Sequence, residues 1–164
     1  MIIYLKNKHT LKIGDFYFKC CVGKNGLSKT KIEADYKTPR GTFEIGHLYF
    51  RKDRIENFKS NIKTVEIKKT MGWCDDKNDK KNYNRLIKIS RNIKCEKLFR
   101  RDQKYDLLIP INYNFKKRIL GKGSCIFLHL TKNYKPTAGC IALKKNDFLV
   151  MLKLINSKTK IKID

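Results

Sequence analysis

Two residues near the end of the chain, His129 and Cys140, have the types and spacing of a thiol nucleophile and its base. His129 ends an apolar run, and Cys140 follows a turn of small residues eleven positions later. A loop of that length allows the imidazole to fold back onto the thiol, and a His beside a Cys favours the reactive thiolate. Gly139 allows close approach to a substrate carbonyl, and the amides of residues 138–140 are placed to form an oxyanion hole. The pattern predicts acyl transfer on a cysteine; a satisfied polar histidine and a buried filler cysteine are the structural alternative.

Other polar groups each have a structural and a functional interpretation. Arg40 lies in a Thr-Pro-Arg-Gly turn, which we expect to edge a cleft where the guanidinium pairs with a substrate carboxylate. The adjacent aspartates 75–76 have no histidine nearby in the sequence, which favours a solvated loop over a metal pair. Trp73 is expected to pack under that loop rather than line a substrate wall. Residues 83–84, Tyr-Asn, fit a turn cap and a substrate contact equally well.

The cysteine pattern excludes the common zinc modules. Six cysteines are present, but no CxxC motif occurs, so a zinc knuckle or ribbon is not expected. Cys20 and Cys21 are adjacent and would point to opposite faces of a strand. We therefore expect small buried residues rather than a disulfide framework. The state of the cysteines other than Cys140 stays open: Cys20, Cys21, Cys74, Cys95 and Cys125.

Short strands must position these groups. Runs rich in β-branched and aromatic residues, bounded by turn formers, recur along the whole chain. The predicted strands are Ile2–Leu5, Phe16–Val22, Thr42–Phe50, Thr64–Ile67, Leu86–Ile89, Leu107–Ile111 and Cys125–Leu130, with Lys158–Ile163 as a closing edge strand. Two helices are expected, one over Glu96–Arg101 and one that begins at an Asn146 N-cap and continues to Ile155. Residues 75–84 read as a loop insertion.

Length and charge bound the fold and the partners. A chain of 164 residues and 19.4 kDa, 41% hydrophobic, is expected to form one domain over residues 1–164. No apolar run reaches the length of a membrane span, and no signal peptide is visible at the start. The net charge of +24 is compatible with nucleic acid, an anionic membrane or an anionic wall polymer as partner. The lysines are spread along the chain, however, which favours a solvated basic surface over a specific nucleic-acid interface.

Three blocks of the sequence together resemble the L,D-transpeptidase catalytic-domain (YkuD-like) family. Residues 136–143, Pro-Thr-Ala-Gly-Cys-Ile-Ala-Leu, with the Phe-Leu-His before them, are similar to the family's active-site signature. Residues 33–43 resemble its Thr-Pro-x-Gly-x-Phe segment with the Glu-x-Asp lead-in of one subgroup. Residues 72–76 and 83–85 resemble the middle region of that subgroup, which carries a Thr-Ala-Gly-Cys motif. The resemblance covers nearly the whole chain.

This resemblance implies a mostly β domain, a sandwich or barrel with a few short helices, that acts on peptidoglycan stem peptides. Cys140 would be the nucleophile with a depressed pKa, His129 the general base and then acid, and Gly139 an oxyanion donor. Thr137, Ala138 and Arg40 are the expected substrate-binding residues. The family reaction forms a thioester and passes the acyl group to an amine, without a cofactor or a metal. The accompanying expectations are carbapenem sensitivity, a periplasmic or cell-envelope location, no specific nucleic-acid partner, no membrane span and a monomeric state.

Two departures and two alternatives accompany the resemblance. Many family members have Ser-His-Gly-Cys followed by an Arg, whereas Thr137 and Ala138 occupy the first two places here and Ala142 replaces the Arg. Acyl-donor anchoring and the group that orients His129 are therefore unassigned, although a backbone carbonyl would serve. The same Cys–His pair would act as an L,D-carboxypeptidase if water replaced the amine. A non-enzymatic basic module for nucleic acid or wall polymer is the second alternative.

Overall fold

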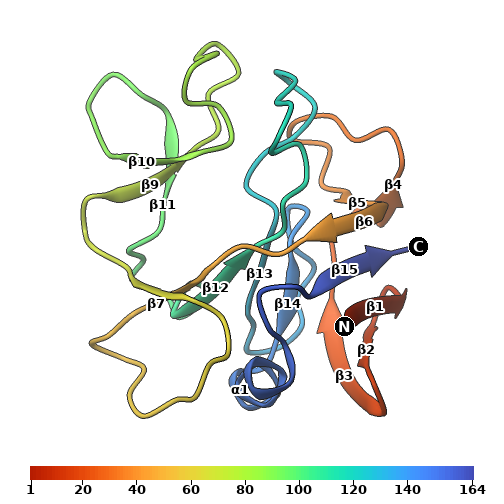
Figure 1. The fold of residues 1–164 in the computed structure, drawn as a ribbon. Coiled ribbons are helices and arrows are strands. Elements are labelled where there is room, and N and C mark those ends of the chain that lie inside the picture. Colours follow the sequence, from red (N-terminus) through yellow and green to blue (C-terminus); the bar gives the residue numbers. More distant parts are fainter.

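The computed structural model describes residues 1–164, which form fifteen strands and one helix (Figure 1). The elements are β1 (Ile2–Asn7), β2 (Thr10–Ile13), β3 (Phe16–Cys21), β4 (Leu27–Ser28), β5 (Thr38–Pro39), β6 (Gly41–Glu44), β7 (Leu48–Phe50), β8 (Thr64–Glu66), β9 (Met71–Cys74), β10 (Leu86–Lys88), β11 (Cys95–Lys97), β12 (Leu107–Pro110), β13 (Phe127–Leu130), β14 (Ile141–Leu143), α1 (Lys145–Leu154) and β15 (Lys160–Ile163). The prediction of a mostly β fold is confirmed, but one α-helix forms where a few short helices were expected.

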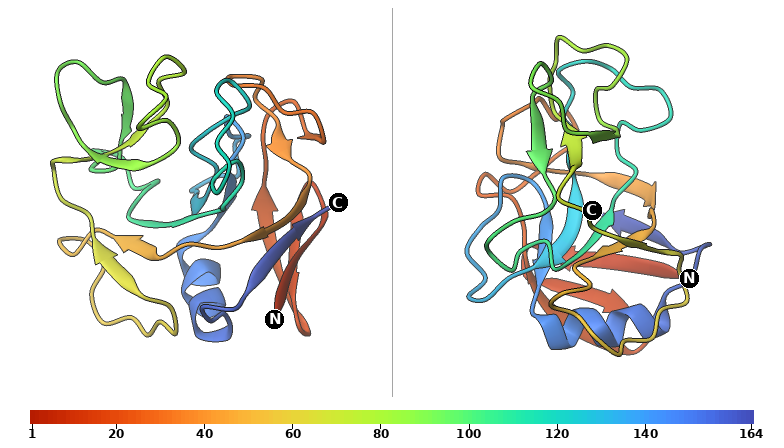
Figure 2. Two further views of the ribbon diagram at one scale, coloured as in Figure 1. Left: turned by 45° about the horizontal axis from the view of Figure 1, so that its top comes forward. Right: turned by 90° about the vertical axis from the view of Figure 1, so that its left-hand side faces the viewer.

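Ten of the strands form one mixed sheet that curls into a half-barrel, in the order β6-β15-β1-β2-β3-β14-β13-β12-β7-β8. The pairs β1–β15, β13–β14 and β7–β8 are parallel, and the other neighbours are antiparallel. A separate three-stranded sheet, β10-β9-β11, stands away from β1–β3 in all three views (Figures 1 and 2). The two-stranded sheet β4–β5 completes the fold. No helix of the chain is both long and apolar enough to cross a membrane.

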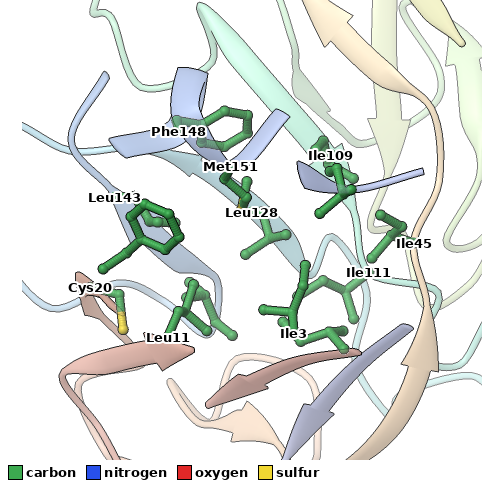
Figure 3. Packing of buried hydrophobic residues seen from close by; sticks show 14 of the residues in the cluster. Ile3, Leu11, Cys20, Ile45, Ile109, Ile111, Leu128, Leu143, Phe148 and Met151 are labelled. Carbon is green, nitrogen blue, oxygen red and sulfur yellow. The ribbon is translucent and has the colours of Figure 1, made fainter. Parts of the chain in front are cut away.

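The main hydrophobic core lies inside the curl of the large sheet, covered by α1. Phe148 and Met151 of the helix are fully buried and face Leu128 of β13, while Ile3 and Leu11 enter from β1 and β2 (Figure 3). A second, smaller cluster lies on the other face of β12 and β13. Successive side chains of a strand point to opposite faces, so the same central strands supply both clusters. The sheet and both of its packed faces are thereby tied together around β12–β14.

Long-range pairing overrides several local expectations. The segment expected as a helix from Glu96 begins instead with strand β11, because Glu96 pairs with Trp73 of β9 and Leu98 is fully buried. The run expected as one strand over residues 42–50 divides into β6 and β7 around Gly46, whose amide bonds to Pro110. A short segment has too few local hydrogen bonds to hold a helix against such pairing.

The two ends of the C-terminal region also differ from expectation. The helix begins at Lys145 with Lys144 as N-cap and no side-chain cap, so Asn146 lies inside the first turn rather than at the cap. Strand β15 is interior, not an edge, because it lies between β1 and β6. The alternation of lysine and isoleucine fits this position equally well, since Ile161 and Ile163 are buried in the core. Residues 75–84 form the expected loop, between β9 and β10.

Candidate active site

Adjacent parallel strands carry the two residues predicted to react. His129 lies in β13, and Cys140 immediately precedes β14. The register pairs His129 with Ala142 and Leu128 with Ile141. Because side chains alternate along a strand, His129, Cys140 and Ala142 share the face that turns away from the core, while Leu128 and Ile141 enter it. The chain therefore brings thiol and imidazole to neighbouring strands on one face of the sheet.

That face forms the floor of a cavity of about 940 Å³. His129 and Cys140 both line it, together with Thr137 and Ala138 of the turn between the two strands. The walls come from the 31–36 loop, from the segment 100–106, from Asp75 just after β9 and from Glu96 in β11. Seven lysines and arginines line the cavity: Lys31, Arg54, Arg100, Arg101, Lys104, Lys132 and Lys135. Five carboxylates also line it: Glu33, Asp75, Glu96, Asp102 and Asp106.

The His129 ring is held in one tautomer. Its Nδ1 lies 2.9 Å from the carbonyl oxygen of Leu130, and a carbonyl can only accept, so Nδ1 carries the proton. The ring of Tyr105 packs edge-on against it. Burial lowers the pKa of His129 to about 4, because the charged imidazolium loses its hydration. The histidine is therefore neutral at physiological pH, with a lone pair on Nε2. The orienting group left unassigned by the sequence is a backbone carbonyl.

The Cys140 thiol is buried and protonated. Its Sγ donates a hydrogen bond to the Cys125 carbonyl at 3.2 Å and accepts one from the Phe127 amide at 3.4 Å. Burial, followed by the negative charge of Glu96, raises the pKa of Cys140 to about 12. The expected depression of this pKa is therefore wrong. A neutral His129 supplies no positive charge, and no hydrogen bond joins thiol and imidazole in this structure.

The turn before Cys140 is braced by Thr137. The Thr137 hydroxyl accepts a hydrogen bond from the Gly139 amide at 3.1 Å and donates one to the Cys140 carbonyl at 2.6 Å. The main chain of Thr137 bonds to Val22 and to Lys24 of the neighbouring segment. Thr137 was expected to bind substrate, but its hydroxyl is engaged in hydrogen bonds within the turn. Ala138 is exposed at the cavity and leaves its backbone open to a ligand.

Glycine is the only residue type that fits at position 139. Its φ is +143°, and a Cβ there would lie 2.9 Å from the Lys37 carbonyl oxygen. Its amide already donates to Thr137, so the expected oxyanion donor is engaged. The amide of Cys140 donates to no acceptor in the structure. That N–H, next to the thiol, is the donor free to receive a developing oxyanion.

A buried ion pair that the sequence did not indicate supports this turn. Lys31 is only 3% exposed, and its Nζ lies 2.6 Å from Oδ1 of Asp35. A Cβ on Gly139 would lie 3.6 Å from the same Nζ, so the ammonium packs beside the turn. Partial burial opposes ionisation of Asp35, but bonds from Lys31 and from the amides of Ile32 and Lys37 lower its pKa. The Glu-x-Asp lead-in pointed to this segment without singling out the lysine.

Two carboxylates beside one another in the small sheet region line the cavity: Glu96 lies in β11, and Asp75 is the first residue after β9. Glu96, expected on a helix, accepts a hydrogen bond from the Tyr105 hydroxyl, and burial raises the pKa of Glu96. Asp75, expected in a solvated loop, has its Oδ1 buried without a hydrogen-bond partner, and burial raises its pKa also. No group of three or more His, Cys, Asp or Glu side chains in the structure could hold a metal ion. Asp75 and Glu96 instead form an acidic wall of the cavity, in which Glu96 lies 3.7 Å from the Arg100 guanidinium.

Asn84 anchors the loop below the thiol. Its Oδ1 accepts from the Trp73 indole at 2.9 Å and from the Cys125 amide at 3.2 Å. Its Nδ2 donates to the carbonyls of Tyr113 and Asn114. Asn84 therefore fixes Cys125, whose carbonyl accepts the hydrogen bond from the Cys140 thiol. Asn84 supports the site from below and is not part of the cavity surface. Trp73 is buried and lies outside the cavity lining, as expected for a packing residue.

Arg40 is the one predicted site residue that the structure keeps apart from the others. Its side chain is exposed, and it is absent from the cavity lining. Its amide bonds to Ser28, so the residue continues the β4–β5 ladder away from the turn. The cavity is lined instead by other cations, among them Lys31, Arg100 and Lys104.

Comparisons with known proteins agree with this architecture. The family model for the L,D-transpeptidase catalytic domain (YkuD) matches residues 1–163. No curated protein matches the chain. The structure of Bd1075 from Bdellovibrio bacteriovorus superposes with a TM-score of 0.51 at 17% identity, over 99% of this chain and 47% of that one. The chain thus spans about half the length of that protein, and the likeness is one of fold. Membership of the Thr-Ala-Gly-Cys subgroup stays a prediction.

Proposed function

The chain belongs to the YkuD family of L,D-transpeptidase catalytic domains, and we propose that it is a cysteine-dependent L,D-transpeptidase acting on peptidoglycan stem peptides. The observation that carries the proposal is the β13–β14 register, which brings Cys140 and His129 to one face of the sheet and into one cavity. YkuD proteins are typically cell-envelope enzymes, and we place this chain there as well. We propose that it acts as a monomer.

The first half of the proposed reaction forms a thioester. A substrate carbonyl, on an L-residue that precedes a D-residue, lies beside Sγ of Cys140. The thiol exchanges its hydrogen bond to Cys125 for Nε2 of His129, which takes the proton as the S–C bond forms. The carbonyl oxygen accepts a hydrogen bond from the amide N–H of Cys140. The C–N bond then breaks, and the imidazolium gives its proton to the departing amine.

The second half resolves the thioester with an amine. An amino group of a neighbouring stem peptide attacks the acyl carbon and gives a proton to Nε2 of His129. The S–C bond breaks, and the sulfur regains its proton. Because the resting pair is neutral on both sides, the cycle starts and ends in the same protonation state.

The charges of the cavity support a zwitterionic peptide as substrate. A third of the chain's 15 acidic residues line the cavity, although the chain as a whole carries a net charge of +24. The rim arginines are partly neutralised, since Arg54 pairs with Asp106 and Arg100 with Asp102. A polyanion such as nucleic acid would meet the acidic wall of Asp75 and Glu96, and also Glu33, which lines the same cavity. Stem peptides carry both amines and carboxylates, which match the acidic and the basic side chains of the cavity.

Product analysis with a stem tetrapeptide tests the proposal. The peptide is incubated with the enzyme and an isotope-labelled acceptor amine, and products are separated by mass. We expect the terminal D-residue to be released and the label to be joined to the remaining tripeptide. Cys140→Ala should lower the rate by about 10⁴-fold or more, while Cys20→Ala, which changes a buried cysteine of the core, should retain it. Release of unlabelled tripeptide alone would assign a carboxypeptidase, and no turnover by folded protein would contradict acyl transfer.

A further inference from the structure

Two cysteines outside the candidate active site face each other across the small sheet. The β9–β11 ladder places Cys74 directly opposite Cys95 in antiparallel register. Both thiols are free in this structure. We propose that Cys74 and Cys95 are a thiol–disulfide pair, and that their oxidation closes a covalent brace across the sheet that forms the acidic wall of the cavity.

The backbone hydrogen bonds show that the pair occupies a non-hydrogen-bonded position of the ladder. The Cys74 amide donates to Arg85, and the Cys74 carbonyl accepts from Asn84, so both groups face β10 rather than β11. On the other side, the Leu98 amide donates to Met71, which fixes the alternation of the ladder. Opposed Cα atoms at non-hydrogen-bonded positions are about 4.5 Å apart, within the range that a disulfide spans. The brace therefore requires no shift of register.

Room for the sulfur atoms comes from Gly72. This residue lies two positions before Cys74 and on the same face of β9. A Cβ on Gly72 would lie 2.7 Å from Sγ of Cys95, so the thiol now rests over the glycine. Rotation of Cys95 about χ1, between staggered rotamers, is the movement that would bring its sulfur to Cys74.

Access and burial give the two thiols different tasks. Cys95 is half-buried and lines a shallow surface depression with Arg91, Lys94 and Lys97, whereas Cys74 is fully buried. A small anionic disulfide, such as oxidised glutathione, can reach Cys95 beside these cations. The Cys95 thiolate attacks one sulfur and releases one reduced thiol. The Cys74 thiolate then attacks the mixed disulfide at Cys95 and releases the second. Two protein thiols are oxidised and one small disulfide is reduced to two thiols.

The bond would act on the cavity through the neighbours of the two cysteines. Asp75 follows Cys74, Glu96 follows Cys95, and both carboxylates line the cavity. Strand β9 also carries Trp73, which packs edge-on against Phe127 of β13. A covalent link between β9 and β11 thus fixes the acidic wall of the cavity. It does so without consuming the Cys140 thiol.

Thiol mapping after equilibration with oxidised and reduced glutathione tests the pair. The equilibrated chain is quenched with acid, alkylated in denaturant so that buried thiols also react, digested without reductant and analysed by mass spectrometry. We expect a cross-linked peptide pair containing residues 74 and 95, lighter by two hydrogen atoms, with Cys140 still alkylated. The oxidised chain should melt about 10 °C higher, since the closed segment of roughly 20 residues is constrained when unfolded. Burial raises the pKa of Cys95 and of Cys74, so the exchange should be faster at alkaline pH.

Single-cysteine variants decide the outcome. Cys95→Ser, at the more accessible position, should abolish both the cross-link and the gain in melting temperature, and Cys20→Ser should preserve both. A stable mixed disulfide at Cys95 that never passes to Cys74 would overturn the proposal, as would a cross-link to any other cysteine. The readout is independent of acyl transfer, so it stands or falls separately from the proposed activity.

Discussion

At the scale of single residues, the two reacting groups are expected to begin the cycle without charge. Burial lowers the pKa of His129 to about 4 and raises that of Cys140 to about 12. A buried ion pair would need compensating partners, whereas a neutral thiol and imidazole satisfy their hydrogen bonds with the backbone. The pair therefore behaves as nucleophile and general base rather than as a preformed thiolate and imidazolium.

The depressed pKa of His129 makes a prediction for stability against pH. The unfolded histidine titrates near 6.5 and the folded one near 4, so the unfolded chain binds more protons between these values. This contribution is fully present above pH 6.5 and is lost as the pH falls toward 4. At pH 5 the loss is about 2 kcal/mol, or a melting temperature lower by about 5 °C.

Thermal melts of wild type and His129→Gln at pH 7 and pH 5 isolate this term. The variant should lack the histidine's share of the acid destabilisation, so its melting temperature should fall less between pH 7 and pH 5 than that of wild type. An identical pH dependence in both proteins would show that His129 is not buried in its neutral form.

At the scale of elements, the turn of residues 136–140 joins the two strands and sets the direction of the thiol. Thr137 ties the turn to itself and to the segment after β3. At Gly139 the backbone runs so close to the Lys37 carbonyl that a Cβ there would collide with it. The position of the thiol is thus set by this turn rather than by the strands.

Gly139→Ala should disable the site. The new Cβ would meet the Lys37 carbonyl at 2.9 Å, in a backbone conformation that L-residues rarely adopt, so the turn must move. A displacement of about 1 Å at a reacting atom costs about 100-fold in rate, and we expect at least that loss in the acylation rate of Cys140.

Gly121→Ala provides the matched control. Gly121 also has a positive φ, at +75°, but a Cβ there meets nothing within 4 Å. It should cost only about 1 kcal/mol of stability and leave acylation unchanged. Equal effects of the two substitutions would argue against a special role of the 136–140 turn.

Comparison of elements shows which features were predictable from the sequence. The alternating strands and the Cys140–His129 spacing depend on local pattern and were predicted. The interior place of β15, the strand at Glu96 and the burial of Lys31 depend on partners distant in the sequence. The rise in the pKa of Cys140 was missed for the same reason, because desolvation is set by the whole fold around the thiol.

At the scale of the whole molecule, the central strands unite both hydrophobic clusters. Leu107 and Ile109 of β12 enter the main core, while Leu108 between them enters the smaller cluster. The end of the chain returns to the middle of the sheet, where β15 pairs with β1 and β6. We therefore propose that residues 1–164 form one domain.

Calorimetry under reducing conditions tests this proposal. One unfolding transition is expected, with equal calorimetric and van't Hoff enthalpies. A separate early transition, assigned by hydrogen exchange to β9–β11, would instead divide the chain into two units.

The most direct test of the central claim is the intact mass of the reduced, folded protein after brief exposure to a carbapenem. The account predicts one covalent adduct on wild type, mapped to Cys140, and none on Cys140→Ala. His129→Gln should acylate far more slowly while the thiol is retained. An adduct that persists in Cys140→Ala, or a folded wild type that forms no adduct, would contradict the assignment of Cys140 as the acylated nucleophile.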